Sequence, residues 1–406
     1  MAALLAVTAQ ASPSLAGSAQ TRPDAASLDD TTRRAADTIR AYSAEGLHRT
    51  ATAVDRASAD ALLARARATG AAASLEPFDL SRVDPVEAFV QIAGRRIDGL
   101  PMFDGPFTGD GGVGGRLGPI GGDQPIAWTR IAANGEVALR KMRQGSPHRA
   151  IVAATLGGKP GLCPVNAGWF SEPFGPPVVQ VSSESMAAFE ALSSSAAEIR
   201  IVSRANRQAT QAFNVVSEIR GTDATLPPVC VMTPRSGWHA NASERGGGLA
   251  CWLEIMRAVV AAHPLRTVKF VASSGHELGH LGLHDYLHRN PTLARGALAW
   301  VHLGANIGTS TGDTGMTPSD ARLRDTALHA FAPHGLETIR QASAAQVGGE
   351  AATIKAADGR FISFIGVNAW FHNPLDLWPD AVDIQAVARF ARAVSDLTLA
   401  LANTPA

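Results

Sequence analysis

Short segments that are almost wholly apolar alternate with helical patterns after residue 206, and this alternation most constrains what the chain can fold into. The expected strands are residues 229–232, 267–273, 298–303 and 361–367. The expected helices are residues 249–262, a helix that begins near 277, and residues 318–331, 335–346 and 380–402. Strands without polar alternation are typical of a parallel sheet that helices cover on both faces. The sequence therefore predicts an α/β fold with a mostly parallel central sheet flanked by helices.

The first 205 residues show a different pattern. Two helices are expected at 29–44 and 57–69, and from 76 to 205 short β-like runs alternate with turns rich in glycine and proline. Within this region, strands are expected at 135–142, 149–156 and 175–183, and a short helix at 185–192. We therefore interpret the chain as a disordered leader or signal remnant (1–27), N-terminal helices of the main domain (28–75), an inserted β-rich domain (76–205) and the main domain (206–406).

The amino-acid composition limits which classes of partner the protein can bind and indicates where in the cell it acts. The 406 residues carry a formal net charge of zero, so no basic excess favours nucleic acid or an anionic membrane surface. No apolar run reaches the ~20 residues that a membrane-spanning helix needs. The first 27 residues are rich in alanine and serine, and residues 9–11 resemble a signal-cleavage site, although a basic leading region is missing. A periplasmic or secreted protein is expected, with a cytoplasmic one as the alternative.

Three cysteines are too few for a disulfide framework or a thiolate zinc site. We interpret Cys163, Cys230 and Cys251 as small buried hydrophobic residues. A pair between Cys230 and Cys251 is the alternative.

Residues 276–280 read His-Glu-Leu-Gly-His, a literal H-E-x-x-H. In zinc proteases this spacing places two imidazoles on one helical face beside a catalytic glutamate. Here a strand runs into the motif through a tight turn, so the motif stands at a helix entrance. A third histidine ligand is expected ten residues after the first, but His284 is eight after it, and the next glutamate is the distant Glu337. We therefore interpret the motif as chance, with His284 and His288 at the surface or packed behind a metal ligand.

Several other motifs, taken in order, resemble the co-catalytic zinc aminopeptidases of the transferrin-receptor and glutamate-carboxypeptidase superfamily. The resemblance spans residues 214–376 and rests on NVVSEIRGT, ERGGGLACWLEIMRA, RTVKFVASSGHELGHLGLHDY, LAWVHLG and FHNPLD. Residues 76–205 resemble the protease-associated domain that many members carry as an insert. The resemblance implies two zinc ions at the carboxyl ends of the strands, a glutamate base, and a peptide or small amide as substrate or ligand.

Matched residue by residue, the resemblance implies that only half of this metal site is retained. Glu244 takes the place of the aspartate that bridges the two ions, Glu277 that of the ligand glutamate, and His372 that of the late histidine. Pro234 and Gly304 take the places of the two ligands that hold only the other ion. Two carboxylates and one imidazole form a reasonable mononuclear set. One zinc ion is therefore expected at Glu244, Glu277 and His372.

His276 stands where the family has its catalytic glutamate. An imidazole with an ordinary pKa near ~6.5 can act as a general base or as a further ligand, so His276 is the expected catalytic residue. Ser236 and Trp238 follow the first of the four strands, and Asp376 closes the H-x-P-x-D motif. These three are candidates for the lining of the substrate cleft.

Two functions follow from this degenerate site. The first is a diverged zinc hydrolase that cleaves peptide or amide bonds. The second is a non-catalytic peptidase homologue that binds peptide or protein in the old cleft, since proline and glycine are what a metal site no longer in use would leave. A serine hydrolase lacks the G-x-S-x-G frame at Ser236 and Ser274, and the glycine-rich stretch 105–122 lacks the ending of a phosphate loop. The sequence leaves the oligomeric state open.

Overall fold

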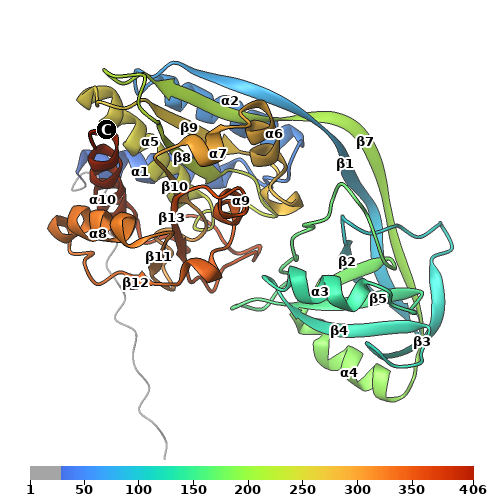
Figure 1. Cartoon of the computed structure of the whole chain (residues 1–406). Coiled ribbons are helices and arrows are strands. Elements are labelled where there is room, and N and C mark those ends of the chain that lie inside the picture. Colours follow the sequence, from blue (N-terminus) through green and yellow to red (C-terminus); the bar gives the residue numbers. More distant parts are fainter. Residues whose placement is uncertain (1–28) are drawn as a thin grey trace, which may run out of the picture.

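Two very long antiparallel strands, β1 (Ala73–Ile92) and β7 (Glu198–Ile219), connect the two lobes of the molecule (Figure 1). The computed structural model describes residues 29–406, so the predicted leader lies outside the described residues. The two strands pair from Ala73 and Ser217 to Gln91 and Arg200, with one irregularity between Pro85 and Glu87. A bulge at a proline is expected, because proline has no N–H for the ladder.

The larger lobe contains the sheet that the sequence predicts. Its central strands are parallel and run in the order β9, β8, β10, β13. Their bounds are β8 (Val229–Pro234), β9 (Val268–Ser273), β10 (Ala299–Leu303) and β13 (Phe361–Gly366). On the outer sides, β7 and β11 (Thr314–Pro318) run antiparallel, and the short β12 (Arg340–Gln341) pairs with β11. The prediction of a mostly parallel central sheet is confirmed.

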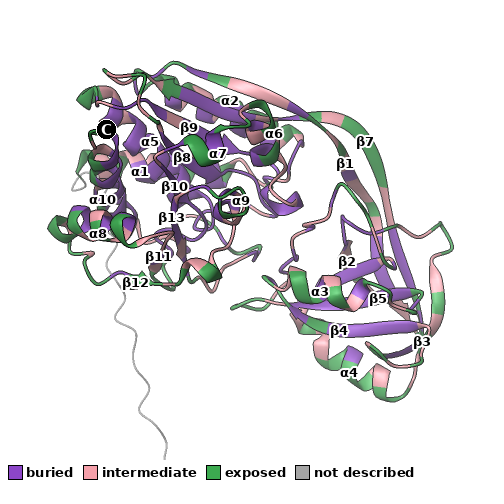
Figure 2. Ribbon diagram, viewed as in Figure 1, coloured by how far each residue is buried: buried purple, intermediate pink, exposed green. Residues whose placement is uncertain are grey.

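Helices cover both faces of this sheet, which Figure 2 shows as buried at the centre of the lobe. One face packs against α1 (Asp30–Ala44), α2 (Ala53–Arg67), α5 (Gly246–Ala262), α8 (Ala321–Phe331) and α10 (Ile384–Ala402). The other face packs against α6 (Leu281–Arg289), α7 (Leu293–Gly296) and α9 (Glu350–Ala356). Apolar strands are therefore buried on both sides, as their composition requires.

The smaller lobe contains a further group of mostly parallel strands, which joins the same sheet through β1 and β7. Its order is β2 (Arg95–Pro101), β6 (Val178–Ser182), β5 (Ala150–Leu156), β4 (Ile126–Ala132) and β3 (Val113–Pro119), with α3 (Glu136–Arg143) and α4 (Met186–Ser194). The predicted insert boundaries, 76 and 205, fall inside β1 and β7, which run through both lobes. The division into domains therefore stays a prediction.

The strand predicted at 135–142 is wrong, because these residues form α3. Leu139 and Arg143, four residues apart, are both buried, which is helical spacing. The guanidinium of Arg143 bonds the Asp104 carboxylate at 2.5 Å inside the lobe. A buried arginine looks like a surface residue in the sequence, so the apolar face of this helix could not be recognised.

The helix predicted at 335–346 is also wrong. Residues 340–341 pair with β11 as β12, and a single 3-10 turn follows at Ala344–Gln346. Pairing with a neighbouring strand outweighs a weak local preference for helix.

All three cysteines are free and buried, and Cys230 and Cys251 lie on opposite faces of the sheet. The interpretation of the cysteines as buried hydrophobic residues is therefore confirmed.

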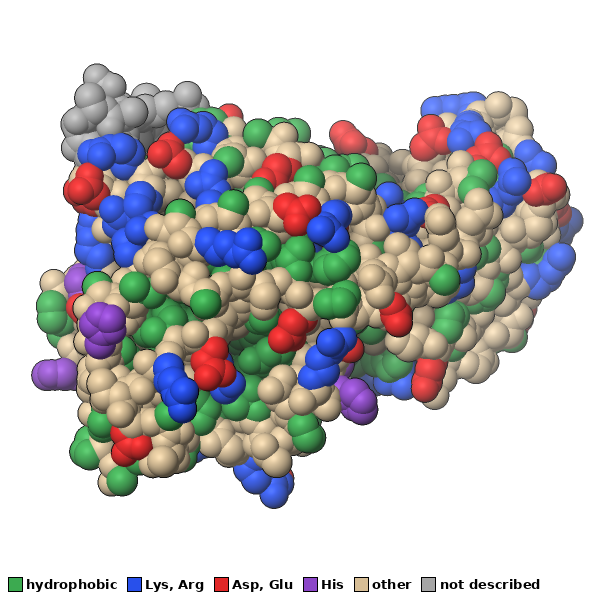
Figure 3. Space-filling model, turned by 90° about the horizontal axis from the view of Figure 1, so that it is seen from above, with side chains coloured by type: hydrophobic (Ala, Val, Ile, Leu, Met, Phe, Trp, Pro, Cys, Tyr) green, Lys and Arg blue, Asp and Glu red, His purple; other side chains and the backbone are tan. Residues whose placement is uncertain are grey.

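Charges of both signs are spread over the face that Figure 3 shows, as the zero net charge suggests. Among residues 29–406, no helix has the length and apolar character that crossing a membrane requires.

His48, in the loop between α1 and α2, is expected to make folding sensitive to acid. It is fully buried, its ring stacks on Tyr42 at 3.7 Å, and burial lowers its pKa to about 3. In the unfolded chain His48 binds a proton near pH 6.5, whereas in the folded chain it stays neutral down to about pH 3. The free energy of unfolding therefore falls as the pH drops from about 6.5 towards 3. Between pH 7.5 and 5.5 the contribution of His48 is about 1 kcal/mol.

Urea unfolding at these two pH values checks this expectation. The difference between them should shrink in His48→Gln and stay unchanged in the exposed control His288→Gln. An equal difference in both variants would contradict it.

Candidate functional site

The carboxyl ends of β8, β9, β10 and β13 meet a loop from the smaller lobe, and the polar residues of interest lie at this junction. The backbone N–H of Ala167 donates to the carbonyl of Glu277 at 2.8 Å. Leu278, in the turn after β9, is buried in the same hydrophobic cluster as Phe170 and Ile151 of the smaller lobe. The turn that carries the H-E-x-x-H motif is therefore clamped between the two lobes.

Within the described residues, one group of three possible metal ligands has its ligand atoms all within 4.8 Å of one another: His276, His280 and Glu350. Nδ1 of His276 lies 2.8 Å from Oε1 of Glu350, and the two imidazole centroids are 5.1 Å apart. Two imidazoles and one carboxylate are a set that zinc accepts in catalytic sites with an open fourth position. The residues present therefore fit one zinc ion.

A compact turn brings the two histidines together. Gly275 and Gly279 adopt φ of +87° and +85°, and His280 is itself left-handed at +61°. A side chain on Gly279 would begin 2.6 Å from the carbonyl oxygen of Gly168 in the smaller lobe, so only glycine fits there. A 3-10 turn, His276–Leu278, therefore separates β9 from α6, and the helix expected from 277 begins at Leu281 instead.

The charge states in this group suit a metal ligand set. Burial alone would raise the pKa of Glu350, but His276 and His280 hold it well below its usual range. The second carboxylate oxygen of Glu350 lies 3.2 Å from Nε2 of His302, whose Nδ1 lies 2.8 Å from the Ser363 hydroxyl. Burial lowers the pKa of His280 to about 4. At neutral pH the carboxylate is ionised and the imidazole of His280 is neutral, which are the forms that bind metal.

The sequence offers no third ligand near the H-E-x-x-H motif, whereas in the structure a carboxylate oxygen of Glu350 lies within 4.8 Å of ligand atoms of both histidines. The expectation that the motif does not lie within one helix is confirmed. His284 and His288 are exposed, as predicted. Glu350 stands 74 residues after His276, at the start of α9, and no local pattern marks it as a ligand.

Of the three residues predicted to hold zinc, the structure brings two together. Nε2 of His372 lies 3.5 Å from Oε1 of Glu244, and the backbone N–H of His372 donates to Oε2 of the same carboxylate. The guanidinium of Arg245 lies 2.7 Å from Oε1 as well. Ligand atoms of Glu244, Glu277 and His372 do not all lie within 4.8 Å of one another.

The carboxylate of Glu277 is engaged elsewhere. Its Oε1 accepts hydrogen bonds from the backbone N–H and the hydroxyl of Thr50, at 2.8 and 2.7 Å. Its Oε2 accepts the hydroxyl of Ser236 at 2.7 Å. The Glu277 side chain is 1% exposed. Its hydrogen bonds connect the loop between α1 and α2 to the residues that follow β8.

No protein-family model and no curated protein matches the sequence. Solved structures do match. The aminopeptidase of Aneurinibacillus sp. strain AM-1 has a TM-score of 0.71 at 16% identity, over 92% of this chain and 94% of that one. BSAP, a zinc aminopeptidase from Bacillus subtilis, has a TM-score of 0.73 at 17% identity, over 90% of this chain and 94% of that one. The Peptidase M28 precursor of Shewanella amazonensis SB2B has a TM-score of 0.74 at 14% identity, over 93% of this chain and 96% of that one.

The chain has the zinc-aminopeptidase fold. At these identities the likeness concerns the fold, and it confirms the architecture that the motifs implied.

Gly304, one of the two positions at which the resemblance implies a replaced ligand, is tightly packed in this zinc-aminopeptidase fold. A Cβ on Gly304 would lie 2.7 Å from Cγ1 of Ile365 and 2.8 Å from Cε1 of His302. A carboxylate side chain does not fit there unless these neighbours move. Pro234, at the other position, ends β8 beside Ser273 and is buried. Both residues are thus packed into the core.

The three predicted cleft residues are all buried. The indole of Trp238 packs edge-on against Phe103 of the smaller lobe. Ser236 bonds Glu277, as described above. Oδ1 of Asp376 accepts the backbone N–H and the hydroxyl of Ser243, and its Oδ2 accepts the N–H of Glu244 at 2.9 Å. Trp238 and Asp376 therefore position neighbouring segments of this site.

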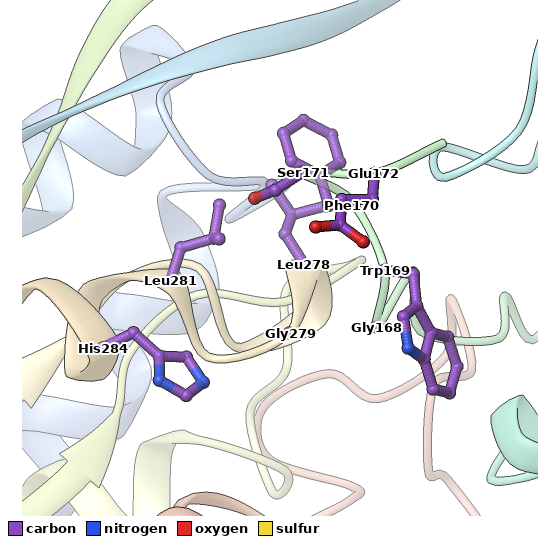
Figure 4. A pocket seen from close by; sticks show the side chains of 9 residues that line it. All are labelled: Gly168, Trp169, Phe170, Ser171, Glu172, Leu278, Gly279, Leu281 and His284. Atoms are coloured by element: carbon purple, nitrogen blue, oxygen red, sulfur yellow. The ribbon is translucent and has the colours of Figure 1, made fainter. Parts of the chain in front are cut away.

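A cleft of about 270 Å³ adjoins the H-E-x-x-H turn (Figure 4). Its lining comes from a loop of the smaller lobe on one side and from the turn and α6 on the other: Gly168, Trp169, Phe170, Ser171, Glu172, Leu278, Gly279, Leu281 and His284. The cleft thus lies between the lobes and next to the proposed ligand His280.

Glu277 is expected to be a structural residue. In Glu277→Ala, three donors lose a charged acceptor, and the free energy of unfolding should fall by about 3 kcal/mol or more. The zinc content per chain should stay as in the parent protein. Urea unfolding and metal analysis of the same samples check both statements.

The exposed residue Glu337 supplies the matched control, Glu337→Ala, which should change stability by less than ~0.5 kcal/mol. If Glu277→Ala loses zinc but keeps its stability, Glu277 is a zinc ligand and the prediction is wrong.

Proposed function

We propose that this chain binds one zinc ion through His276, His280 and Glu350 and hydrolyses a peptide or amide bond of a ligand held in the adjoining cleft. The observation that carries this proposal is the convergence of three buried or half-buried ligand atoms within 4.8 Å. It differs from the site that the sequence resemblance implies, because the ion lies at the H-E-x-x-H turn. His276 then serves as a ligand.

The roles of the surrounding residues follow from their contacts. His302 contacts the second oxygen of Glu350 and so orients the carboxylate, and the hydroxyl of Ser363 holds the ring of His302 from its other nitrogen. The hydroxyl of Thr353, 3.3 Å from Nδ1 of His280, does the same for that ring. A bound zinc ion supplies a water of lowered pKa and polarises a carbonyl oxygen.

The cleft supports a peptide as the ligand. Trp169, Phe170 and Leu281 offer an apolar surface for a side chain, and Glu172 adds one carboxylate at the edge. The zinc aminopeptidases that share this fold act on peptides, as their names state.

A non-catalytic peptide-binding homologue is the second candidate. The buried ion pair of Arg245 with Glu244 and the tight packing around Gly304 support it, because the two-ion centre that the resemblance implies needs a free carboxylate at the first position and room for a carboxylate side chain at the second. In this case the His276–Glu350–His302 contacts are a hydrogen-bond network that satisfies a buried carboxylate.

Zinc analysis of the purified protein tests the metal site. About one zinc per chain is expected after supplementation, and His280→Ala and Glu350→Gln should weaken binding at least ~10-fold. His288→Ala is the matched control, since His288 is an exposed histidine in α6, the helix that follows His280. Absence of zinc from the parent protein, or equal zinc in all variants, would overturn the proposal.

Turnover separates the two candidates. Release of product from a panel of aminoacyl-nitroanilides and dipeptides, lost in His280→Ala, supports the hydrolase. Saturable binding of the same dipeptides without product supports the binding homologue.

A further inference from the structure

A second group of buried polar atoms lies apart from His276, His280 and Glu350. Glu244, just before α5, and His372, after β13, are 0% and 1% exposed, and Oε1 of the glutamate lies 3.5 Å from Nε2 of the histidine. A zinc ion with ligand bonds of ~2 Å separates two tetrahedral ligand atoms by a similar distance. The two atoms therefore have the spacing of a ligand pair.

Both atoms also present lone pairs. Nδ1 of His372 lies 2.6 Å from the carbonyl oxygen of Pro164, and a carbonyl can only accept, so Nδ1 carries the hydrogen. Burial lowers the pKa of His372 to about 4, so Nε2 has no proton at neutral pH. Among the described residues, neither Nε2 nor Oε1 of Glu244 has a hydrogen-bond partner. Two buried acceptor atoms that face each other need a cation beside them.

That cation is Arg245. Its Nη2 lies 2.7 Å from Oε1 of Glu244, and the arginine side chain is 0% exposed. Its Nε donates to the carbonyl of Ser236 at 2.9 Å, which fixes the guanidinium in the core. Burial would raise the pKa of Glu244, but Arg245 and His372 hold it below its usual range. Each charge of this pair therefore depends on the other.

A guanidinium in this place excludes a metal ion. A divalent ion bound by Oε1 of Glu244 would lie within a few ångströms of the Arg245 guanidinium, and two like charges this close together in a buried site repel each other strongly. Glu244 and His372 are positions at which the sequence resemblance implies zinc. Arg245 is the reason that the residues present do not fit it.

We propose that the guanidinium of Arg245 is a built-in cation at the Glu244–His372 pair, and that this pair becomes a zinc site when the guanidinium is removed. The protein thus keeps a metal-type donor pair in its core without a metal.

The test uses the His280→Ala variant, in which the other zinc group is disabled. In this background, Arg245→Met should lower Tm, and zinc chloride in excess should raise it again by at least about 2 °C. Cobalt(II), added in place of zinc, should give a visible absorption band. Adding His372→Ala should abolish the rise in Tm and the band. Arg257→Met, in the helix α5 that follows Arg245 and with a partly exposed side chain, should show neither effect.

No rise in Tm with zinc in Arg245→Met, or a rise that persists in His372→Ala, would overturn the proposal. If Arg245→Met does not fold, the charge-free pair Glu244→Gln with Arg245→Met decides the question. It should be more stable than Glu244→Gln alone, which leaves a buried arginine without its partner. A double variant no more stable than the single one would show that Arg245 is not the countercharge.

Discussion

Burial of carboxylates at one edge of the sheet is the constraint on which this site depends. An ionised carboxylate removed from water needs a cation or several donors. Glu277 receives three donors, Glu244 receives Arg245, and Glu350 receives two histidines. Each solution ties together segments that are far apart in the chain, so the same contacts that satisfy the charges also hold the loops in place.

These solutions distinguish the chain from what its fold alone would suggest. The structures of the zinc aminopeptidases superpose over nine-tenths of the chain, yet function depends on the residues of a site and less on the architecture that carries them. Here the carboxylate of Glu244 is paired with Arg245, and the candidate metal group lies at the turn after β9, where Leu278 packs into the hydrophobic cluster of the smaller lobe. The smaller lobe therefore takes part in building the site.

Local patterns predicted much of the main domain. The apolar strands were recognisable because both of their faces are buried, and the helices that cover them show apolar stripes. The failures have a physical cause in each case. The buried face of α3 includes an arginine, so its apolar pattern is incomplete in the sequence. Residues 340–341, within the helix expected at 335–346, pair with the neighbouring strand β11 instead. The candidate metal group was missed because Glu350 is a single glutamate between two glycines and an alanine, without spacing to the histidines.

The sequence by itself determined the α/β architecture and the presence of two histidines in the turn that follows a strand. Only the tertiary structure decided which carboxylate meets which partner. Side chains that are 41 to 227 residues apart in sequence share hydrogen bonds in this site. Such partners are chosen by the packing of strands and loops, because a buried charge takes whichever donor the folded chain places within reach.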